Sequence, residues 1–157
     1  MDMRLIDPFV NSTKNIIEEM TQINIDILEK PYFEDGDMES FGVASVINFS
    51  GKMRGRFLID ISKSLSNEIV YCMLEEKLNL KDRMYVAAIS EMNNTITGDA
   101  NTFLNNEYHL GLRLAPPIVF TGRKVVISAS KIDSFSVKGK TKYGEFKLNI
   151  GFQEELK

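Results

Sequence analysis

Apolar residues recur every three or four positions in three stretches of the chain, which is typical of helices with one buried face. The first stretch covers residues 7–28, with Pro8 in a position that suits the first turn of a helix. The second begins among possible N-cap residues at 62–66 and runs to about Leu78. The third and longest covers residues 82–106. The pattern therefore predicts three helices.

Other stretches are short and rich in Val, Ile and Phe, which favours strands. Residues 41–50 and 53–61 are separated by the turn sequence Ser50-Gly-Lys, so they predict an antiparallel hairpin. Further strands are expected at 118–120 and 124–130, and a last hairpin at 134–138 and 145–153, turned over residues 139–144.

These elements predict an α+β fold, in which an antiparallel-rich sheet is covered by helices on one face. The length of 157 residues, 43% of them hydrophobic, suits a single domain spanning residues 1–157. The stretch from Gly51 to Phe57 resembles that from Gly139 to Phe146, which suggests a pseudo-duplicated unit. The alternative is that two unrelated hairpins use similar turn chemistry.

The helix at 82–106 has an unusual outer face. Successive residues rotate by about 100° around a helix, so residues three or four apart share a face. Ala87, Glu91, Asn94 and Gly98 then lie together, away from the core. The opposite, buried stripe is expected to contain Tyr85, Ile89, Met92, Ile96 and Phe103.

Glycine within a helix costs about 1 kcal/mol relative to alanine. A partner that comes close to the backbone would explain Gly98, and the small Ala87 would serve the same purpose. The alternative is that Glu91 and Asn94 are ordinary solvated residues and that Gly98 has no role.

Composition excludes several classes of function. The net charge of −3 gives no basic field for a nucleic acid or an anionic membrane. No segment approaches the roughly 20 apolar residues that cross a bilayer, and no signal peptide is evident. The one cysteine, Cys72, lies in an apolar run and is expected to be a core thiol. We therefore expect a cytoplasmic protein without disulfides.

The common catalytic motifs are also missing from the sequence. There is no phosphate-binding glycine loop and no dinucleotide fingerprint. With one histidine and one cysteine, His- or Cys-rich metal sites and the usual Ser-His or Cys-His systems are excluded unless His109 serves. His109 is expected to be a surface or capping residue. The acidic stretch Glu34–Asp37 is expected to be a solvated turn.

The Asn94 carboxamide is neither a base nor a nucleophile, but it can donate and accept hydrogen bonds at once, so it could orient a water molecule. Phosphoryl transfer depends on such positioning. Glu91 could anchor a cation on a partner. The pair lacks metal ligands and positive charge, so a partner would have to supply the phosphoryl site.

Glu91-Met-Asn-Asn94 followed by Gly98-Asp-Ala100 resembles the Glu-x-x-Asn-x-x-x-Gly-x-Ala signature of the CheC/CheX/FliY family of bacterial chemotaxis phosphatases. The stretch from Val46 to Leu58 resembles that family's strand–Gly–strand hairpin, and Ala115-Pro-Pro-Ile-Val119 with Gly122 resembles its Pro-containing segment. The resemblance covers residues 7–152 and implies the pseudo-duplicated fold of that family.

The resemblance implies an enzyme that dephosphorylates the response regulator CheY. Asn94 would position the attacking water, and Glu91 would pair with the regulator's active-site Lys. Ala87 and Gly98 would lie beneath the docked partner. The aspartyl phosphate and Mg²⁺ would belong to the partner receiver domain, and no cofactor of the chain's own is expected.

Glu19-Met-Thr-Gln22, in the first helix, has Gln in place of the motif's Asn, so we expect a single site, as in CheX rather than CheC or FliY. The resemblance to CheX also implies a homodimer joined edge to edge. Two alternatives stay open. The chain could be a non-catalytic adaptor or flagellar-switch-like module, or it could serve a receiver domain outside chemotaxis.

Overall fold

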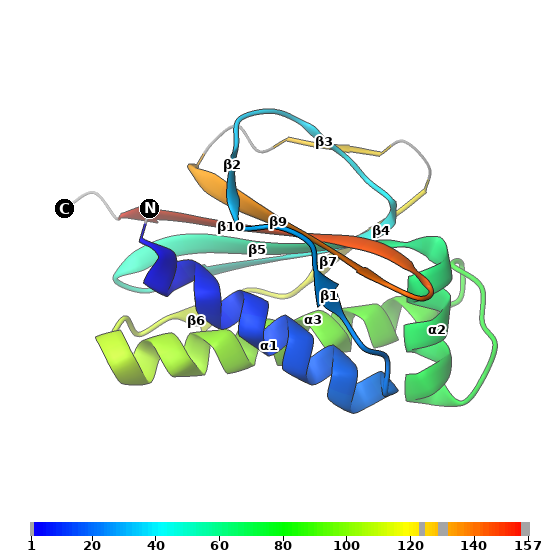
Figure 1. Ribbon diagram of the computed structural model, residues 1–157. Helices are drawn as coiled ribbons and strands as arrows, with labels where there is room; N and C mark the ends of the chain where they lie inside the picture. Colours follow the sequence, from blue (N-terminus) through cyan, green and yellow to red (C-terminus); the bar gives the residue numbers. More distant parts are fainter. Residues whose placement is uncertain (1, 123–124, 129–131, 155–157) are drawn as a thin grey trace.

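In the computed structural model, which describes residues 2–122, 125–128 and 132–154, three helices cover one face of an antiparallel sheet (Figure 1). The predicted α+β class is therefore confirmed. The helices are α1 (Met3–Thr21), α2 (Lys63–Leu74) and α3 (Arg83–Tyr108). The four long strands are β4 (Gly42–Ser50), β5 (Met53–Ser62), β9 (Ser134–Thr141) and β10 (Gly144–Glu154).

The long strands lie in the order β9-β10-β5-β4, so two hairpins meet at the centre of the sheet. Short strands extend its edges: β1 (Asp26–Ile27) and β2 (Tyr32–Glu34) pair with β9, and β6 (Arg113–Leu114) and β7 (Ile118–Thr121) pair with β4. β3 (Met38–Glu39) and β8 (Val126–Ile127) form a separate two-stranded sheet. Figure 1 shows that this pair lies on the side of the main sheet opposite the helices.

Side chains of β5 alternate between two apolar clusters, one on each face of the sheet. Phe57, Ile59 and Ile61 belong to the main core beneath the helices, where Phe9 of α1 stacks on Phe57 with ring centroids 5.1 Å apart. Leu58 joins a small second cluster with Met38 and Val46. Side chains on successive residues of a strand point to opposite faces, which produces these two clusters.

The first helix is shorter at its C-terminus than the sequence predicts. Gln22 takes a left-handed conformation, with φ of 60°, and its N–H bonds the Glu18 carbonyl, so α1 ends at Thr21 instead of continuing to residue 28. Ile23 and Ile25 are nevertheless buried, because the Glu18 carboxylate accepts a hydrogen bond from the Ile25 N–H at 2.9 Å and holds this irregular segment against the core. The buried Ile23 therefore continues the apolar spacing of α1 although it lies outside the helix.

Other boundaries also differ. α1 begins at Met3, capped by Asp2, so Pro8 lies inside the helix rather than in its first turn. α2 ends at Leu74 because Glu75 adopts φ of 59°. The strand predicted at 124–130 is seen only as Val126–Ile127, and residues 124 and 129–130 lie outside the described residues.

The two hairpins each place a glycine directly across from a phenylalanine. Gly55 faces Phe49 and Gly139 faces Phe146, and a Cβ on either glycine would overlap the ring. The phenylalanine precedes the glycine in the first hairpin and follows it in the second. The two hairpins thus share this pairing, but the two glycines lie on different strands of their hairpins. The turn of the second hairpin lies within the predicted range 139–144 but is shorter, at residues 142–143, because β9 continues to Thr141 and β10 begins at Gly144.

The acidic stretch Glu34–Asp37 is only partly a solvated turn. Glu34 is partly buried, pairs with Lys147 at 2.8 Å and accepts a hydrogen bond from Ser136 at 2.6 Å. Burial acts to raise the pKa of Glu34, but Lys147 and Ser136 outweigh it and the net shift is downward. Asp35 and Asp37 are exposed, as expected.

A second carboxylate, Asp60, holds the start of β4 from the same side of the sheet. It is 2% exposed and accepts hydrogen bonds from Ser40 Oγ at 2.8 Å and from the Phe41 N–H at 3.0 Å. Burial raises the pKa of Asp60 to about 6, against these two hydrogen bonds, which act to lower it.

Candidate functional site

α3 runs across the helical layer and carries the motif residues from its second turn to just past its midpoint. The Asp82 side chain caps its first turn by accepting from the Met84 N–H at 2.9 Å. At its other end His109 adopts φ of 55° and its N–H bonds the Asn105 carbonyl at 3.0 Å. His109 is exposed, which confirms the predicted capping role.

The buried side of α3 matches the predicted stripe except at Phe103. Tyr85, Ile89, Met92 and Ile96 are at most 1% exposed, whereas Phe103 is 49% exposed. Ala100 and Leu104 complete the stripe instead. The prediction for Phe103 is therefore wrong, because this position lies at the margin of the buried stripe and faces the groove beside α1.

Ala87, Glu91, Asn94 and Gly98 lie on the opposite side of α3, which we call the motif face. Ala87 and Glu91 are exposed, and Asn94 and Gly98 are half-buried. Among the described residues the Asn94 amide makes no hydrogen bond, and the Glu91 carboxylate has only a long contact, 3.5 Å, with Thr95 Oγ1. Both side chains are thus available to a partner.

Nothing within the described part of the chain requires glycine at position 98. A Cβ at Gly98 would meet only Leu114 Cδ1, at 3.9 Å, which is an ordinary van der Waals distance. Alanine would therefore fit there and would favour the helix by about 1 kcal/mol.

Directly behind the motif face lies a buried polar group that sequence reasoning missed. Asn93 is 0% exposed; its Nδ2 donates to Ser45 Oγ of β4 at 2.9 Å, and its Oδ1 accepts from Thr97 Oγ1 at 3.0 Å. The local signal was present, because Asn93 and Thr97 are polar residues four positions apart within the apolar stripe. Their partner on β4 is not predictable from that spacing.

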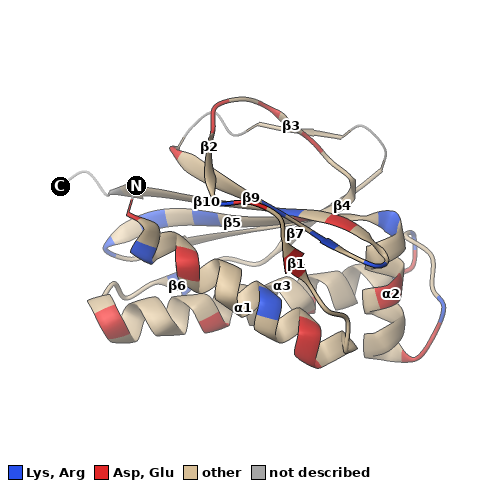
Figure 2. Cartoon of the chain, viewed as in Figure 1, with Lys and Arg blue, Asp and Glu red and all other residues tan. Residues whose placement is uncertain are grey.

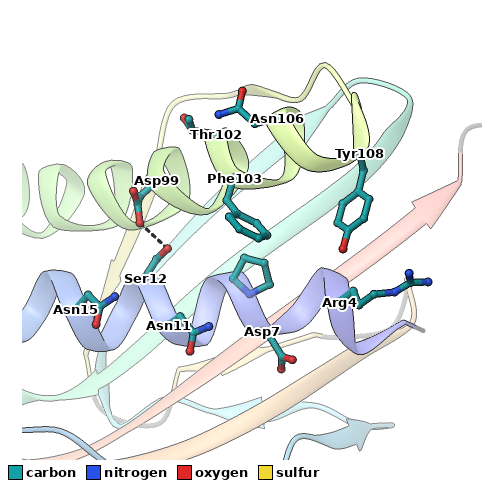
Figure 3. A pocket seen from close by; sticks show the side chains of 11 residues that line it. Arg4, Asp7, Asn11, Ser12, Asn15, Asp99, Thr102, Phe103, Asn106 and Tyr108 are labelled. Atoms are coloured by element: carbon teal, nitrogen blue, oxygen red, sulfur yellow. Dashed lines mark hydrogen bonds between the residues drawn. The ribbon is translucent and has the colours of Figure 1, made fainter.

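A groove of about 500 Å³ lies between α1 and the C-terminal half of α3 (Figure 3). Ser12 of α1 donates a hydrogen bond to Asp99 of α3 at 2.7 Å across it, and the rings of Phe103 and Tyr108 are partly exposed there. Its polar lining consists mostly of carboxamides, from Asn11, Asn15 and Asn106, and carboxylates, from Asp7 and Asp99. These groups form no nucleophile–base pair.

Cys72 is less buried than predicted. It is half-buried on α2, and its Sγ lies 3.7 Å from the Thr21 carbonyl and 3.8 Å from Glu68 Oε1. Burial is the larger cause, and the nearby Glu68 carboxylate the smaller, of a raised pKa of the Cys72 thiol. The raised pKa disfavours the reactive thiolate.

Charge is unevenly distributed over the fold. Figure 2 shows Lys and Arg along the long strands, whereas α1 and α3 carry more Asp and Glu. In the part of the chain that the structure describes, no three His, Cys, Asp or Glu side chains gather as a metal site. Within the same residues, no helix is long and apolar enough to cross a membrane.

A family model described as chemotaxis phosphatase CheX matches residues 43–138, more than half of the chain. The chain belongs to the CheX family. The matched region includes β4, β5, α2 and the whole of α3, and so it contains the motif face. The predicted family is therefore confirmed. A comparison with curated proteins found no match.

Solved structures of CheX and CheC-like proteins share the fold. A CheX from Desulfovibrio desulfuricans is 24% identical, with a TM-score of 0.85 over 95% of this chain and 99% of that one. A CheC-like superfamily protein from a Shewanella species is 25% identical, with a TM-score of 0.87 over 98% and 99%. The CheX of a CheX–CheY–BeF₃–Mg²⁺ complex from Borrelia burgdorferi is 20% identical, with a TM-score of 0.78 over 95% and 97%.

Proposed function

We propose that the chain hydrolyses the aspartyl phosphate of a CheY-like response regulator in bacterial chemotaxis, with Asn94 positioning the attacking water. The observation that carries this proposal is the motif face. Glu91 and Asn94 lie on it without strong internal partners, between the small residues Ala87 and Gly98, in a chain of the CheX family.

The chemistry of the motif face suits an incomplete active site. A carboxamide can accept a hydrogen bond from water and donate one toward a phosphoryl oxygen, which fixes the direction of attack. Such positioning accounts for much of the catalysis in phosphoryl transfer. We assign the phosphorylated Asp and the Mg²⁺ to the receiver domain. The Borrelia complex, which holds a CheX, CheY, BeF₃ and Mg²⁺, supports that division.

The decisive experiment is to mix the purified chain with a Mg²⁺-bound, phosphorylated CheY-like receiver domain and to follow phosphate release. Release that accelerates with the concentration of the chain is the expected result. A tight complex that leaves the rate unchanged would instead identify a non-catalytic adaptor. A panel of receiver domains from other signalling systems then determines the partner.

Glu91 is proposed to pair with a cationic side chain of the receiver. Removing one member of a desolvated charge pair costs about 2–5 kcal/mol. Glu91→Ala should therefore raise the KM for the phosphorylated receiver by tenfold or more, while kcat at saturation falls less. Glu107→Ala, which removes an exposed glutamate near the C-terminal end of the same helix, should change neither. An unaltered KM in the Glu91 variant would exclude the docking role.

We also propose that the chain forms a homodimer through the edge strand β7. β7 pairs with β4 on one side, and Ile118 and Phe120 are 50% and 39% exposed. Edge strands with exposed apolar side chains favour pairing with another chain. Light scattering should give a mass near twice 17.9 kDa at micromolar concentration. A monomeric mass under these conditions would overturn the proposal.

A further inference from the structure

A completely buried amide lies one residue before Asn94. Asn93 is completely buried, and its amide bridges two elements: Nδ2 donates to Ser45 Oγ on β4, and Oδ1 accepts from Thr97 Oγ1 one turn further along α3. Ser45 and Thr97 are also 0% exposed. The three side chains form a dry hydrogen-bonded link between the sheet and the helix.

Such a link can fix the rotation and register of the helix, which apolar packing does not fix by itself. The hydrophobic effect is non-directional, so it does not by itself select one rotation of a helix about its axis. A hydrogen bond is directional and short, and a satisfied buried polar network makes one arrangement unique. Because Asn93 and Asn94 are adjacent, fixing the first fixes the direction in which the second leaves the helix.

We infer that Asn93 is a positioning residue for the proposed phosphatase reaction. The link from Ser45 through Asn93 to Thr97 sets the rotation and register of α3 at this point, so that the Asn94 amide meets the partner's phosphoryl site in one geometry. This inference rests on the proposed function. A misplacement of about 1 Å at a reacting centre can cost 10²-fold in rate.

A second buried asparagine on the same helix provides a natural contrast. Asn101 is 3% exposed, yet among the described residues neither its Oδ1 nor its Nδ2 has a hydrogen-bond partner. It lies seven residues beyond Asn94, with a similar degree of burial to Asn93 but without the link to β4. Asn101 therefore separates the effect of burying an amide in α3 from the effect of the link.

The test is steady-state dephosphorylation of a Mg²⁺-bound phosphorylated CheY-like receiver by the full chain. Asn93→Leu, which is close in volume, should lower kcat by tenfold to about 10²-fold and leave KM nearly unchanged. Ser45→Ala breaks the same link from the sheet and should also lower kcat. Asn101→Leu should leave both constants at their wild-type values. A wild-type kcat in Asn93→Leu, with the wild type active, overturns the inference.

A triple variant separates positioning from stability. Asn93→Leu leaves the hydroxyls of Ser45 and Thr97 without their buried partner, whereas adding Ser45→Ala and Thr97→Val removes every polar side chain of the link, which is often close to neutral for stability. We expect the midpoint of urea unfolding to recover in the triple variant while kcat stays low. Recovery of kcat together with the midpoint would show that Asn93 acts only on stability.

Amide hydrogen exchange provides a readout that does not require activity. Residues 91–97 should exchange faster in Asn93→Leu than in Asn101→Leu, because α3 is no longer fixed to β4 at that point. If the wild-type chain does not accelerate phosphate release, the proposed function fails and this comparison still decides whether Asn93 fixes the helix. Equal exchange in the two variants would overturn the inference on its own.

Discussion

Asn94→Ala is expected to reduce the stimulated dephosphorylation of a receiver domain by about 10²–10³-fold, the usual loss when one positioned transition-state group is removed. The protein should not be destabilised, because the Asn94 amide has no hydrogen-bond partner among the described residues. Alanine is also the better helix former, by up to about 0.7 kcal/mol. The urea midpoint should therefore stay the same or rise while activity is lost.

The matched control is Asn106→Ala, which makes the same chemical change at an exposed position near the C-terminal end of α3. Its rate of phosphate release should equal that of the wild type. Complex formation with a beryllofluoride-loaded receiver should survive in Asn94→Ala, since Glu91 is intact. A normal rate of release from the Asn94 variant would refute the role assigned to this residue.

The second large effect is expected from bulk at position 98. Gly98→Leu should fold, because a Cβ there meets Leu114 Cδ1 only at 3.9 Å and the rest of the side chain extends from a half-buried position. A leucine on the motif face would occupy space that the docked receiver needs. The KM should therefore rise by more than tenfold, equivalent to a loss of at least about 1.4 kcal/mol in binding.

Two comparisons make the second test specific. Gly98→Ala should raise the free energy of unfolding by about 1 kcal/mol and have a smaller effect on KM, so the loss should grow with side-chain size. Asn106→Leu places the same bulk at an exposed site away from the motif face and should leave KM unchanged. If Gly98→Leu folds and acts like the wild type, close approach at this glycine is not needed.

The parts of this fold that were predictable from sequence are those set by local periodicity. α3, the β4–β5 hairpin and the placement of Glu91 and Asn94 on one outer face follow from spacings of three, four and two residues. The likeness of Glu91–Ala100 to a known signature then indicated the family, which the structure alone could not have named.

The structure differs from the sequence-based predictions where contacts between distant residues determine the end of a helix or the burial of a side chain. Ile23 and Ile27 continue the spacing of α1, but the left-handed Gln22 ends the helix, so Ile23 is buried in irregular chain and Ile27 is exposed in β1. The ion pair between Glu34 and Lys147 and the bond from Asn93 to Ser45 join residues far apart in sequence. No local pattern reports such pairs, so the link behind the motif face became visible only in the structure.

The central pairing of β5 with β10 has a consequence for how the protein is made. α3 leaves the ribosome before residues 134–154, which supply half of the long strands. Until they arrive, β5 has only β4 as a neighbour, and the core lacks Phe146, Leu148, Ile150 and Phe152. Contacts between distant parts of a chain form slowly. The helix that presents Glu91 and Asn94 is therefore synthesised well before the sheet beneath it is complete, and a chaperone that shields apolar surface would act in that interval.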